Sequence, residues 1–356
     1  MSDIKLISQK RYWGGILALS GVIFIWVASS FAMNSLFGEM NYNKPFLVTY
    51  LNTATFSIYL LPSLFKRSKP KNQLINQNNI KNYASIPSST SIPQQQEKLS
   101  TIETIKLSLT FCILWFFANF TTNASLAYTT VGSSTILSSM SGLFTLGIGA
   151  LFNVEKLNMI KFMAVLISFT GVILVSYSDH INDSLPYATA PLIGDILALL
   201  GAVFYGCYTI LLKLKIGSED RIDMTLFFGF VGAFNILLLW PVLPLLDYFG
   251  LETFEIPTNS TLWIVIFLNA FIGTFLSDYL WLLSMLMTSP LVVTLGISLT
   301  TPLALMGDVL FKGIIPNIQY SIGALLVVAG FLAVNTNALK EAKIKSQQEI
   351  LENSQL

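Results

Sequence analysis

Residues 14–24 read GGILALSGVIF, and residues 194–204 read GDILALLGAVF. Seven of the eleven aligned positions are identical. Apolar segments resemble one another by chance, but here the likeness continues along the chain. The sequence therefore predicts two copies of one unit, residues 13–178 and 191–338. Two further pairs of segments align: SSTILSS at 133 with SPLVVTL at 289, and AVLISFTGVILV at 164 with GALLVVAGFLAV at 323.

The composition places this chain in a membrane. Of its 356 residues, 53% are hydrophobic and 11% are charged, whereas a soluble domain carries about 25% charged residues. Apolar blocks of about 18 residues or more recur along the chain, which is typical of helices that cross a bilayer. A soluble protein would need ten buried helices with almost no amphipathic ones around them. The sequence predicts an all-α integral membrane protein, and the net charge of +1 gives no sign of a nucleic-acid partner.

Ten apolar segments are long enough to be membrane spans. The predicted spans are 13–34, 45–65, 107–127, 131–152, 159–178, 192–212, 224–245, 261–283, 289–310 and 320–338. With the N-terminal tail 1–12 in the cytosol, 18 of the 20 Lys and Arg residues fall on the cytosolic side, as the positive-inside rule requires. We therefore expect both termini in the cytosol, including the tail 339–356, and a disordered polar cytosolic loop over 66–103. Asn182 and Asn259 head sequons on the other side, so close to a span that we expect poor glycan occupancy.

Each predicted unit has five spans, and five is an odd number. The second copy then enters the membrane from the opposite side, so the fold predicted is ten transmembrane helices arranged as two inverted five-helix repeats. Inverted copies can exchange conformations, which opens a central site first to one side and then to the other. The alternative is a duplication retained only for helix packing, because the glycines of the repeated phrase also suit close contact between helices.

Several strings in these spans resemble a known transporter family. They are IWVASSF at 25, YNKPFLVTYLN at 42, NASLAYTTVGSSTILSS at 123, FFGFVGAFNILLLWP at 227 and IGTFLSDYLWL at 272. Together with the five-plus-five pattern, they resemble the drug/metabolite transporter superfamily with its EamA-like repeats, and most of all the F-type branch of solute carrier family 35. The resemblance implies a ten-helix secondary transporter of an endomembrane or the cell surface. Of these we expect an endomembrane, the vacuole, lysosome or Golgi, rather than the plasma membrane.

Three carboxylates fall inside predicted spans: Asp195, Asp278 and Asp308. An ionisable group at membrane depth is costly, so each is a candidate functional residue. Asp278 is the first candidate, either for proton coupling or as a counter-ion for a cationic solute, with a structural role as the alternative. For Asp308 the simpler explanation is an ion pair with Lys312, four residues on, and for Asp195 a position at the positive end of its helix dipole.

Polar and aromatic side chains of other spans are expected to complete the site. Two helix faces carry hydroxyl groups at helical spacing and are expected to meet around a shared cavity, although small residues also serve tight packing. These residues are Ser134, Ser138, Ser141 and Thr145 in the fourth span, and Thr294, Ser298, Thr301 and Asp308 in the ninth. The remaining candidates are Trp26, Asn119, Asn123, Tyr205, Tyr208 and Asn235.

These features predict a secondary active transporter of a small polar solute, neutral or cationic, with or without proton coupling. No Lys or Arg lies deep in a span, and the ninth span reads GISLTTP where the nucleotide-sugar branches carry a Lys-containing stretch, so a phosphate-bearing solute fits less well. A nucleotide-sugar transporter of the Golgi or ER remains the alternative, as does a membrane sensor or scaffold that does not transport. No catalytic signature, metal ligand set or cofactor motif is present, so we expect no enzyme. The expected partners are the lipid bilayer and a solute.

Overall fold

Helices form all the regular structure of the described part of the chain. This computed structural model describes residues 2–62, 98–153, 158–181, 190–216, 221–287, 293, 296–297, 299–333 and 336–337. In chain order the helices are α1 (Ser2–Phe37), α2 (Pro45–Ala54), the 3-10 helix η1 (Thr55–Leu60), α4 (Thr101–Ser125), α5 (Val131–Ser138), α6 (Ser141–Leu151), α7 (Met159–Ile181), α8 (Pro191–Ile216), α9 (Met224–Leu239), α10 (Val242–Tyr248), α11 (Ser260–Leu268), the π-helix η3 (Asn269–Leu276), α12 (Ser277–Met287), α14 (Thr300–Lys312) and a last helix, Ile318–Ala333. The predicted all-α membrane class is confirmed.

Seven described helical segments are long and apolar enough to cross a membrane. They are Tyr12–Phe37, Thr101–Ser125, Val131–Leu151, Met159–Ser178, Pro191–Ile216, Met224–Tyr248 and Ser260–Ser284. The last helix is a shorter apolar one. The predicted span 45–65 begins with α2 and η1, and the predicted span 289–310 has only α14 as a continuous described helix. Seven of the ten predicted spans therefore correspond to a long apolar helix, and the other three correspond to shorter described helices.

Two helices begin earlier than predicted. α1 starts at Ser2, within the predicted N-terminal tail. α4 starts at Thr101, within the predicted loop 66–103, because Ser100 and Glu103 form a capping box: the Glu103 N–H donates to Oγ of Ser100 over 3.3 Å, and the Ser100 N–H donates to Oε2 of Glu103 over 2.9 Å. The predicted loop is wrong at this end, and residues 63–97, Asn182 and the tail 339–356 lie outside the described residues.

Two predicted spans are not continuous α-helices. The fourth is interrupted at Ser139–Met140, where the Ser139 hydroxyl donates to the Ile136 carbonyl over 2.5 Å and the backbone tightens into bonds between residues three apart. The eighth span contains the eight-residue π-helix η3 between α11 and α12. Apolar periodicity alone does not encode such changes of helical pitch.

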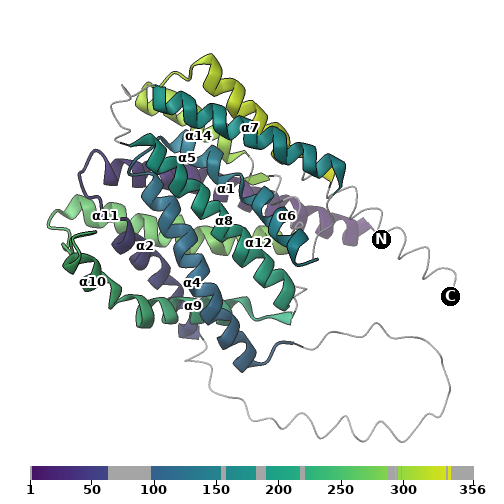
Figure 1. The fold of residues 1–356 in the computed structure, drawn as a ribbon. Helices are drawn as coiled ribbons and strands as arrows, with labels where there is room; N and C mark the ends of the chain where they lie inside the picture. Colours follow the sequence, from purple (N-terminus) through teal and green to yellow (C-terminus); the bar gives the residue numbers. More distant parts are fainter. Residues whose placement is uncertain are drawn as a thin grey trace, which may run out of the picture.

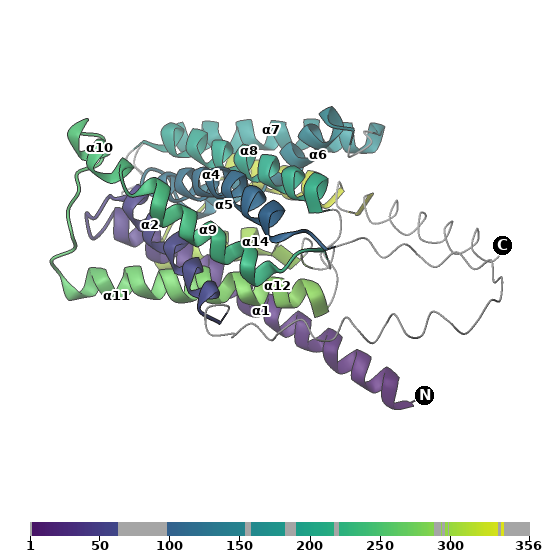
Figure 2. The same ribbon diagram turned by 90° about the horizontal axis from the view of Figure 1, so that it is seen from below.

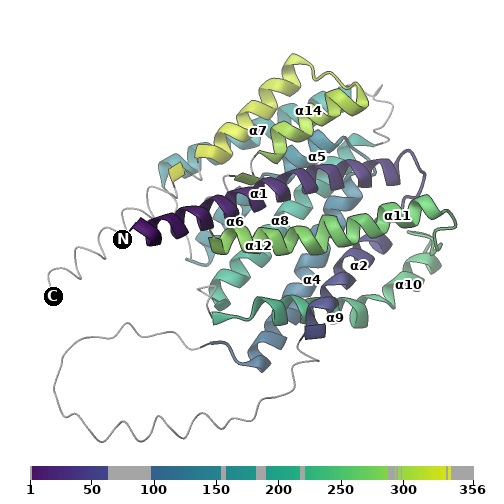
Figure 3. The ribbon, with the colours of Figure 1, turned by 180° about the vertical axis from the view of Figure 1, so that it is seen from behind.

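The helices form one bundle with two distinguishable ends. α1 begins and the last helix ends at the same end of the bundle, whereas α10 and the start of α11 lie at the opposite end, which we call the far side (Figures 1 and 2). α4 packs between α8 and α9, and α1 runs along the line of α11, η3 and α12 (Figure 3). α5 contacts α14, so segments of the two predicted repeats interleave.

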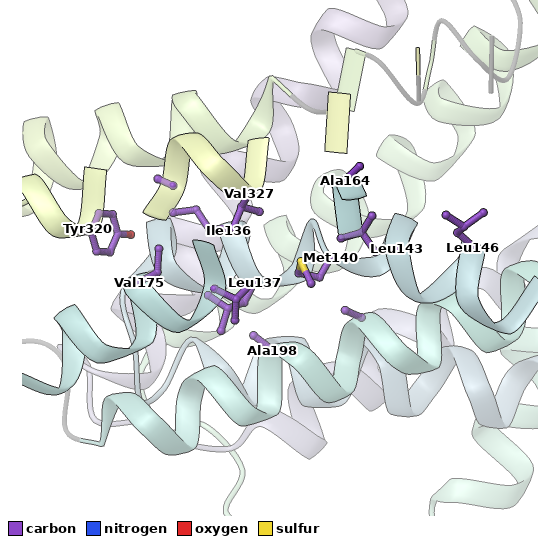
Figure 4. Close-up of a cluster of buried hydrophobic side chains, with 13 residues drawn as sticks. Ile136, Leu137, Met140, Leu143, Leu146, Ala164, Val175, Ala198, Tyr320 and Val327 are labelled. Carbon is purple, nitrogen blue, oxygen red and sulfur yellow. The ribbon is translucent and has the colours of Figure 1, made fainter. Parts of the chain in front are cut away.

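Apolar packing holds these helices together in several clusters. One joins α5, α6, α7, α8 and the last helix, with Leu137, Met140, Ala198 and Val327 at its centre (Figure 4). Another is rich in aromatic rings and joins η1, α4, α8 and α9. Two residues of this aromatic cluster, Tyr59 and Tyr208, lie near the carboxylate of Asp278.

Candidate functional site

Asp278 is a carboxylate that the fold buries without a partner. It lies in the first turn of α12 and is 8% exposed. No hydrogen bond or ion pair with any described residue satisfies its oxygens, and no described Lys or Arg acts on its charge. A charged group at membrane depth costs about 2.5–3.5 kcal/mol on insertion scales. An unpaired carboxylate here is therefore a candidate functional group.

The π-helix immediately before Asp278 controls how this residue is presented. π-helical turns are rare and occur frequently at functional sites, and their wider turn changes the direction of the side chains that follow. α1 holds this segment in place, because Ser29 donates to Oδ1 of Asn269 and the Trp26 indole N–H donates to Oγ of Ser277 over 3.1 Å. The first span thus positions the helix that carries the carboxylate.

Three tyrosines lie near Asp278. Its charge acts on the hydroxyl groups of Tyr59, Tyr205 and Tyr208, which come from η1 and α8. Tyr59 stacks on Phe275 with ring centroids 4.4 Å apart, and its hydroxyl donates to the Phe275 carbonyl over 2.9 Å. The faces of aromatic rings carry partial negative charge and attract cations. The surroundings of the carboxylate therefore favour positive charge.

Tyr205 is the most accessible aromatic residue of this group. Its side chain is 38% exposed, and its hydroxyl lies within reach of the charge of Asp278. Its ring centroid lies 4.9 Å from that of Tyr208, which lies 5.3 Å from that of Trp115. An accessible aromatic ring and a few polar groups inside a bundle are the usual features of a small-molecule site.

Asp308, in contrast, caps a helix. Its Oδ2 accepts the Gly132 N–H over 2.6 Å at the N-terminus of α5, whereas its Oδ1 is buried with no hydrogen-bond partner among the described residues. Negative charge is favourable at this end of a helix. Lys312 was predicted to be its partner; it acts on Asp308 as a nearby charge, and it forms an ion pair with Glu39. The geometry is that of a structural cap.

Asp195 also has structural partners. Its Oδ1 accepts from the Thr129 hydroxyl over 3.3 Å, and its Oδ2 accepts from the Ser176 hydroxyl. These bonds connect α8 to α7 and to the turn before α5. The sequence prediction explained Asp195 by the dipole of its helix. The structure shows that it also accepts hydrogen bonds from two hydroxyl groups outside that helix.

The two hydroxyl faces mostly contact protein. Ser134 shares a 2.6 Å hydrogen bond with Ser125, Thr145 donates to the Ser141 carbonyl of its own helix over 2.7 Å, and Thr301 is 2% exposed. The Ser138 hydroxyl is buried with no hydrogen-bond partner among the described residues. Thr294 and Ser298 lie outside the described residues. The shared hydroxyl-lined cavity therefore stays a prediction.

The three predicted asparagines connect helices or bond within one. Asn123 donates to the Thr49 hydroxyl over 2.9 Å, and Asn235 donates to the Tyr50 carbonyl over 2.9 Å, so both bind α2. Asn119 donates to the Trp115 carbonyl one turn earlier over 2.9 Å. Of the predicted residues, the structure brings Trp26, Tyr205 and Tyr208 into the neighbourhood of Asp278. The asparagines form hydrogen bonds to α2 or within their own helix instead.

Sequence reasoning missed four residues of this site. Tyr59, Trp115, Asn269 and Ser277 have no charge and no repeated spacing to single them out. One signal could have found Asn269 and Ser277: both are polar residues in the same apolar span as Asp278. Polar residues in an apolar span tend to face the interior of the bundle.

A polar clasp, formed by Tyr42, Lys44, Glu252 and Glu255, connects the two predicted repeats on the far side. Pro45 occupies the first turn of α2 and Lys44 gives no side-chain cap, so Glu252 supplies one: its carboxylate accepts the N–H groups of Phe46 and Leu47, each over 2.9 Å. Lys44 also forms a 3.6 Å ion pair with Glu255. Burial raises the pKa of Glu252, although the two N–H groups and Lys44 oppose the shift.

Tyr42 belongs to the same clasp. Its hydroxyl donates to the Glu255 carbonyl over 2.7 Å. Burial, together with the charges of Glu252 and Glu255, raises the pKa of Tyr42 to about 12. The phenol therefore stays protonated and remains a donor at any physiological pH.

Comparisons with known proteins place this geometry in a family. The EamA-like transporter family matches residues 192–336. An uncharacterised vacuolar membrane protein of Saccharomyces cerevisiae is 44% identical over 97% of this chain and 94% of its own length. The thiamine-repressible mitochondrial transport protein THI74 of the same yeast is 38% identical over 90% of this chain and 91% of its own length. Solute carrier family 35 member F5 of Mus musculus is 32% identical over 92% of this chain and 78% of its own length.

These relatives are membrane and transport proteins, not enzymes, and they match nearly the whole chain. The resemblance noted in the sequence is confirmed, and the bilayer and a small solute are its partners. The chain belongs to the EamA-like transporters of the drug/metabolite transporter superfamily, in the F branch of solute carrier family 35.

Proposed function

We propose that this protein is a secondary active transporter that moves a small polar metabolite, neutral or cationic, by alternating access between two inverted five-helix repeats. The observation that carries the proposal is the pairing of equivalent helices. Its solute site is centred on Asp278.

α7 and the last helix are equivalent helices of the two predicted repeats, and they pack against each other. A two-fold axis in the membrane plane requires such a pair to be antiparallel with equivalent contacts. In the repeat alignment Ala164 corresponds to Gly323, and Gly171 corresponds to Gly330. A Cβ on Gly171 would lie 2.6 Å from the Gly323 carbonyl oxygen, and a Cβ on Gly330 would lie 2.6 Å from the Ala164 carbonyl oxygen. The two contacts are equivalent, and their order along the chain makes the helices antiparallel. An axis along the membrane normal would make equivalent helices parallel.

A second set of contacts obeys the same relation. Gly194 of α8 meets Thr129, just after α4, and Gly14 of α1 meets Met287 of α12. Gly14 and Gly194 are equivalent in the repeat, and Thr129 and Met287 are separated by 158 positions, within the 156 to 159 of the other aligned pairs. The α8–α4 contact in one half thus corresponds to the α1–α12 contact in the other.

The two equivalent contacts differ in tightness, which supports alternating access. Gly201 of α8 lies against α4 so closely that a Cβ would stand 2.4 Å from the Thr122 hydroxyl oxygen, whereas a Cβ on the equivalent Gly21 would meet no described atom within 4 Å. The α8–α4 contact lies toward the far side, where the clasp of Glu252 and Lys44 also lies. This difference between Gly201 and Gly21 supports a conformation that is closed on the far side.

The solute class follows from the charges near Asp278. No described Lys or Arg faces this carboxylate, so the site offers no partner to a phosphate. This supports a neutral or cationic solute over a nucleotide sugar. The vacuolar relative supports placement in an endomembrane, with both termini in the cytosol according to the distribution of Lys and Arg.

The test is exchange in proteoliposomes. Purified protein is reconstituted, loaded with a panel of cationic, neutral and nucleotide-linked metabolites, and assayed for counterflow with and without a pH gradient. Saturable counterflow of a neutral or cationic solute supports the proposal, and dependence on the gradient adds proton coupling. Counterflow of nucleotide sugars alone would replace the solute class. Large non-saturating currents would indicate a channel, and no flux of any solute would leave a sensor or scaffold.

A further inference from the structure

We propose that the solute site takes a monovalent organic cation of the methylated ammonium type, whose charge is spread over its methyl groups. The inference rests on the proposed transport function, because it assigns the solute of that site. Its basis is the juxtaposition of an unpaired carboxylate on α12 with aromatic side chains from three other helices. These residues are Asp278, Tyr59, Trp115, Tyr205 and Tyr208.

An ionised Asp278 would need a positive partner, and the described residues supply none. Asp278 is 8% exposed and has no described donor or cation beside it, in contrast to Asp195 and Asp308, which both accept hydrogen bonds. A buried charge without a partner carries a large desolvation cost. A cationic ligand neutralises it, which makes ligand charge a direct source of binding energy.

The surroundings of the carboxylate select the kind of cation. A metal ion such as Na⁺ or Ca²⁺ needs several oxygen ligands, but the Tyr59 hydroxyl already donates to the Phe275 carbonyl, and the hydroxyls of Tyr205 and Tyr208 bond to each other. What remains available is π surface. Aromatic rings bind quaternary ammonium groups well, because these cations are weakly hydrated and lose little on leaving water.

An accessible ring marks where the ligand would lie. Tyr205 is the exposed member of the group, at 38%, and Tyr208 packs behind it on Trp115. Trp26 approaches from α1, where its indole N–H is already bound to Ser277. A methylated ammonium group on the face of Tyr205 would have the carboxylate of Asp278 as its counter-ion.

Choline and its neutral isostere, 3,3-dimethylbutan-1-ol, separate charge from shape. Binding to the full-length protein in nanodiscs is measured by titration calorimetry at low ionic strength. We expect choline to bind at least about tenfold more tightly than the isostere, which corresponds to about 1.4 kcal/mol. Asp278→Asn should remove at least about tenfold of choline affinity, and Asp278→Glu should retain most of it. Tyr205→Leu should weaken choline binding several-fold, whereas Tyr205→Phe, which keeps the π face, should not.

Several outcomes would overturn the inference. Equal affinity for choline and the isostere removes the role of charge, and tight binding of Na⁺ alone, titrated as NaCl, would make this an inorganic ion site. Unchanged choline affinity in Asp278→Asn, with a wild-type melting temperature, would remove Asp278. Counterflow assays separate this from the transport proposal: saturable flux of neutral solutes without cation binding refutes only the cation site, and cation binding without any flux refutes only transport.

Discussion

Replacement of Gly171 by Ala tests the helix pairing on which the inverted-repeat proposal depends. A Cβ at this position would lie 2.6 Å from the Gly323 carbonyl oxygen, 2.8 Å from Cγ2 of Val327 and 2.9 Å from its backbone nitrogen. Two of these three atoms are backbone, so no side-chain rotation relieves the clash. Because ordinary contact begins at 3.4 Å, α7 and the last helix must separate by about 0.8 Å. A gap of that size forfeits a quarter to a half of each dispersion contact along the interface.

The net cost follows from two opposing terms. Overpacking of a tight contact costs about 1–3 kcal/mol, and the better helix propensity of Ala returns up to about 1 kcal/mol. We expect Gly171→Ala to lose about 1–2 kcal/mol of stability, a fall of roughly 2–4 °C in Tm for a chain of this size. The assay is intrinsic tryptophan fluorescence of the detergent-purified protein during a thermal scan.

Two further variants serve as controls for the effect of Gly171→Ala on Tm. Gly147→Ala adds the same methyl group where a Cβ would meet no described atom within 4 Å, so its Tm should stay equal or rise slightly. Gly323→Ala disturbs the same contact, since its Cβ would lie 2.8 Å from the Gly171 carbonyl oxygen. The double variant should therefore lose less than the sum of the single losses. If Gly171→Ala melts like Gly147→Ala, the close approach of these helices is wrong and the support it lends to inverted repeats is gone.

Four further predictions follow from the described contacts. Asp278→Asn should abolish transport or its pH dependence at unchanged abundance, because this carboxylate has no described partner to lose; full activity with an unchanged pH response would exclude it from the mechanism. Asp308→Asn should cost about 1.5–3 kcal/mol by weakening a charge-assisted bond to the Gly132 N–H, and an unaltered Tm would argue against the cap. Burial raises the pKa of Glu252 above its ordinary 4.5, so its contribution to stability is full below 4.5 and is lost as the pH rises through the raised value; the Tm of the wild type relative to Glu252→Gln should therefore fall between pH 4 and pH 8, and a constant difference would contradict the shift. Tags at both ends should be digested by protease outside sealed vesicles whose cytosolic face is exposed, and a protected C-terminal tag would overturn the ten-span prediction.

The sequence predicted the membrane class, the transporter family and part of the candidate site. Asp278 could be found because a lone Asp in an apolar span is costly wherever the fold puts it. Tyr205 and Tyr208 were also named in advance, as aromatic residues of a span. Tyr59 and Trp115 were not, because an aromatic residue in an apolar helix looks the same whether it packs against lipid, a core or a carboxylate.

The sequence ranked Asp278 first among the three interior carboxylates, but it could not identify the partners of Asp195 and Asp308. Asp308 and Asp278 are both Asp residues in apolar spans, yet the fold brings Asp308 to the N-terminus of α5 and leaves Asp278 without a partner. The difference depends on residues far apart in the chain, since Gly132 and Asp308 are separated by 176 positions. Only tertiary contacts decide which carboxylate accepts a hydrogen bond from the protein.

Composition and apolar blocks determined by themselves that this chain is an all-α membrane protein, because a bilayer imposes length and hydropathy on every segment that crosses it. The repeated phrase added a duplication, and the odd number of spans in each copy predicted its inversion. Only the tertiary structure decided the break at Ser139, the π-helix before Asp278 and the clasp on the far side. Each of these depends on hydrogen bonds or packing whose geometry is set by neighbouring helices, and apolar periodicity does not record such contacts.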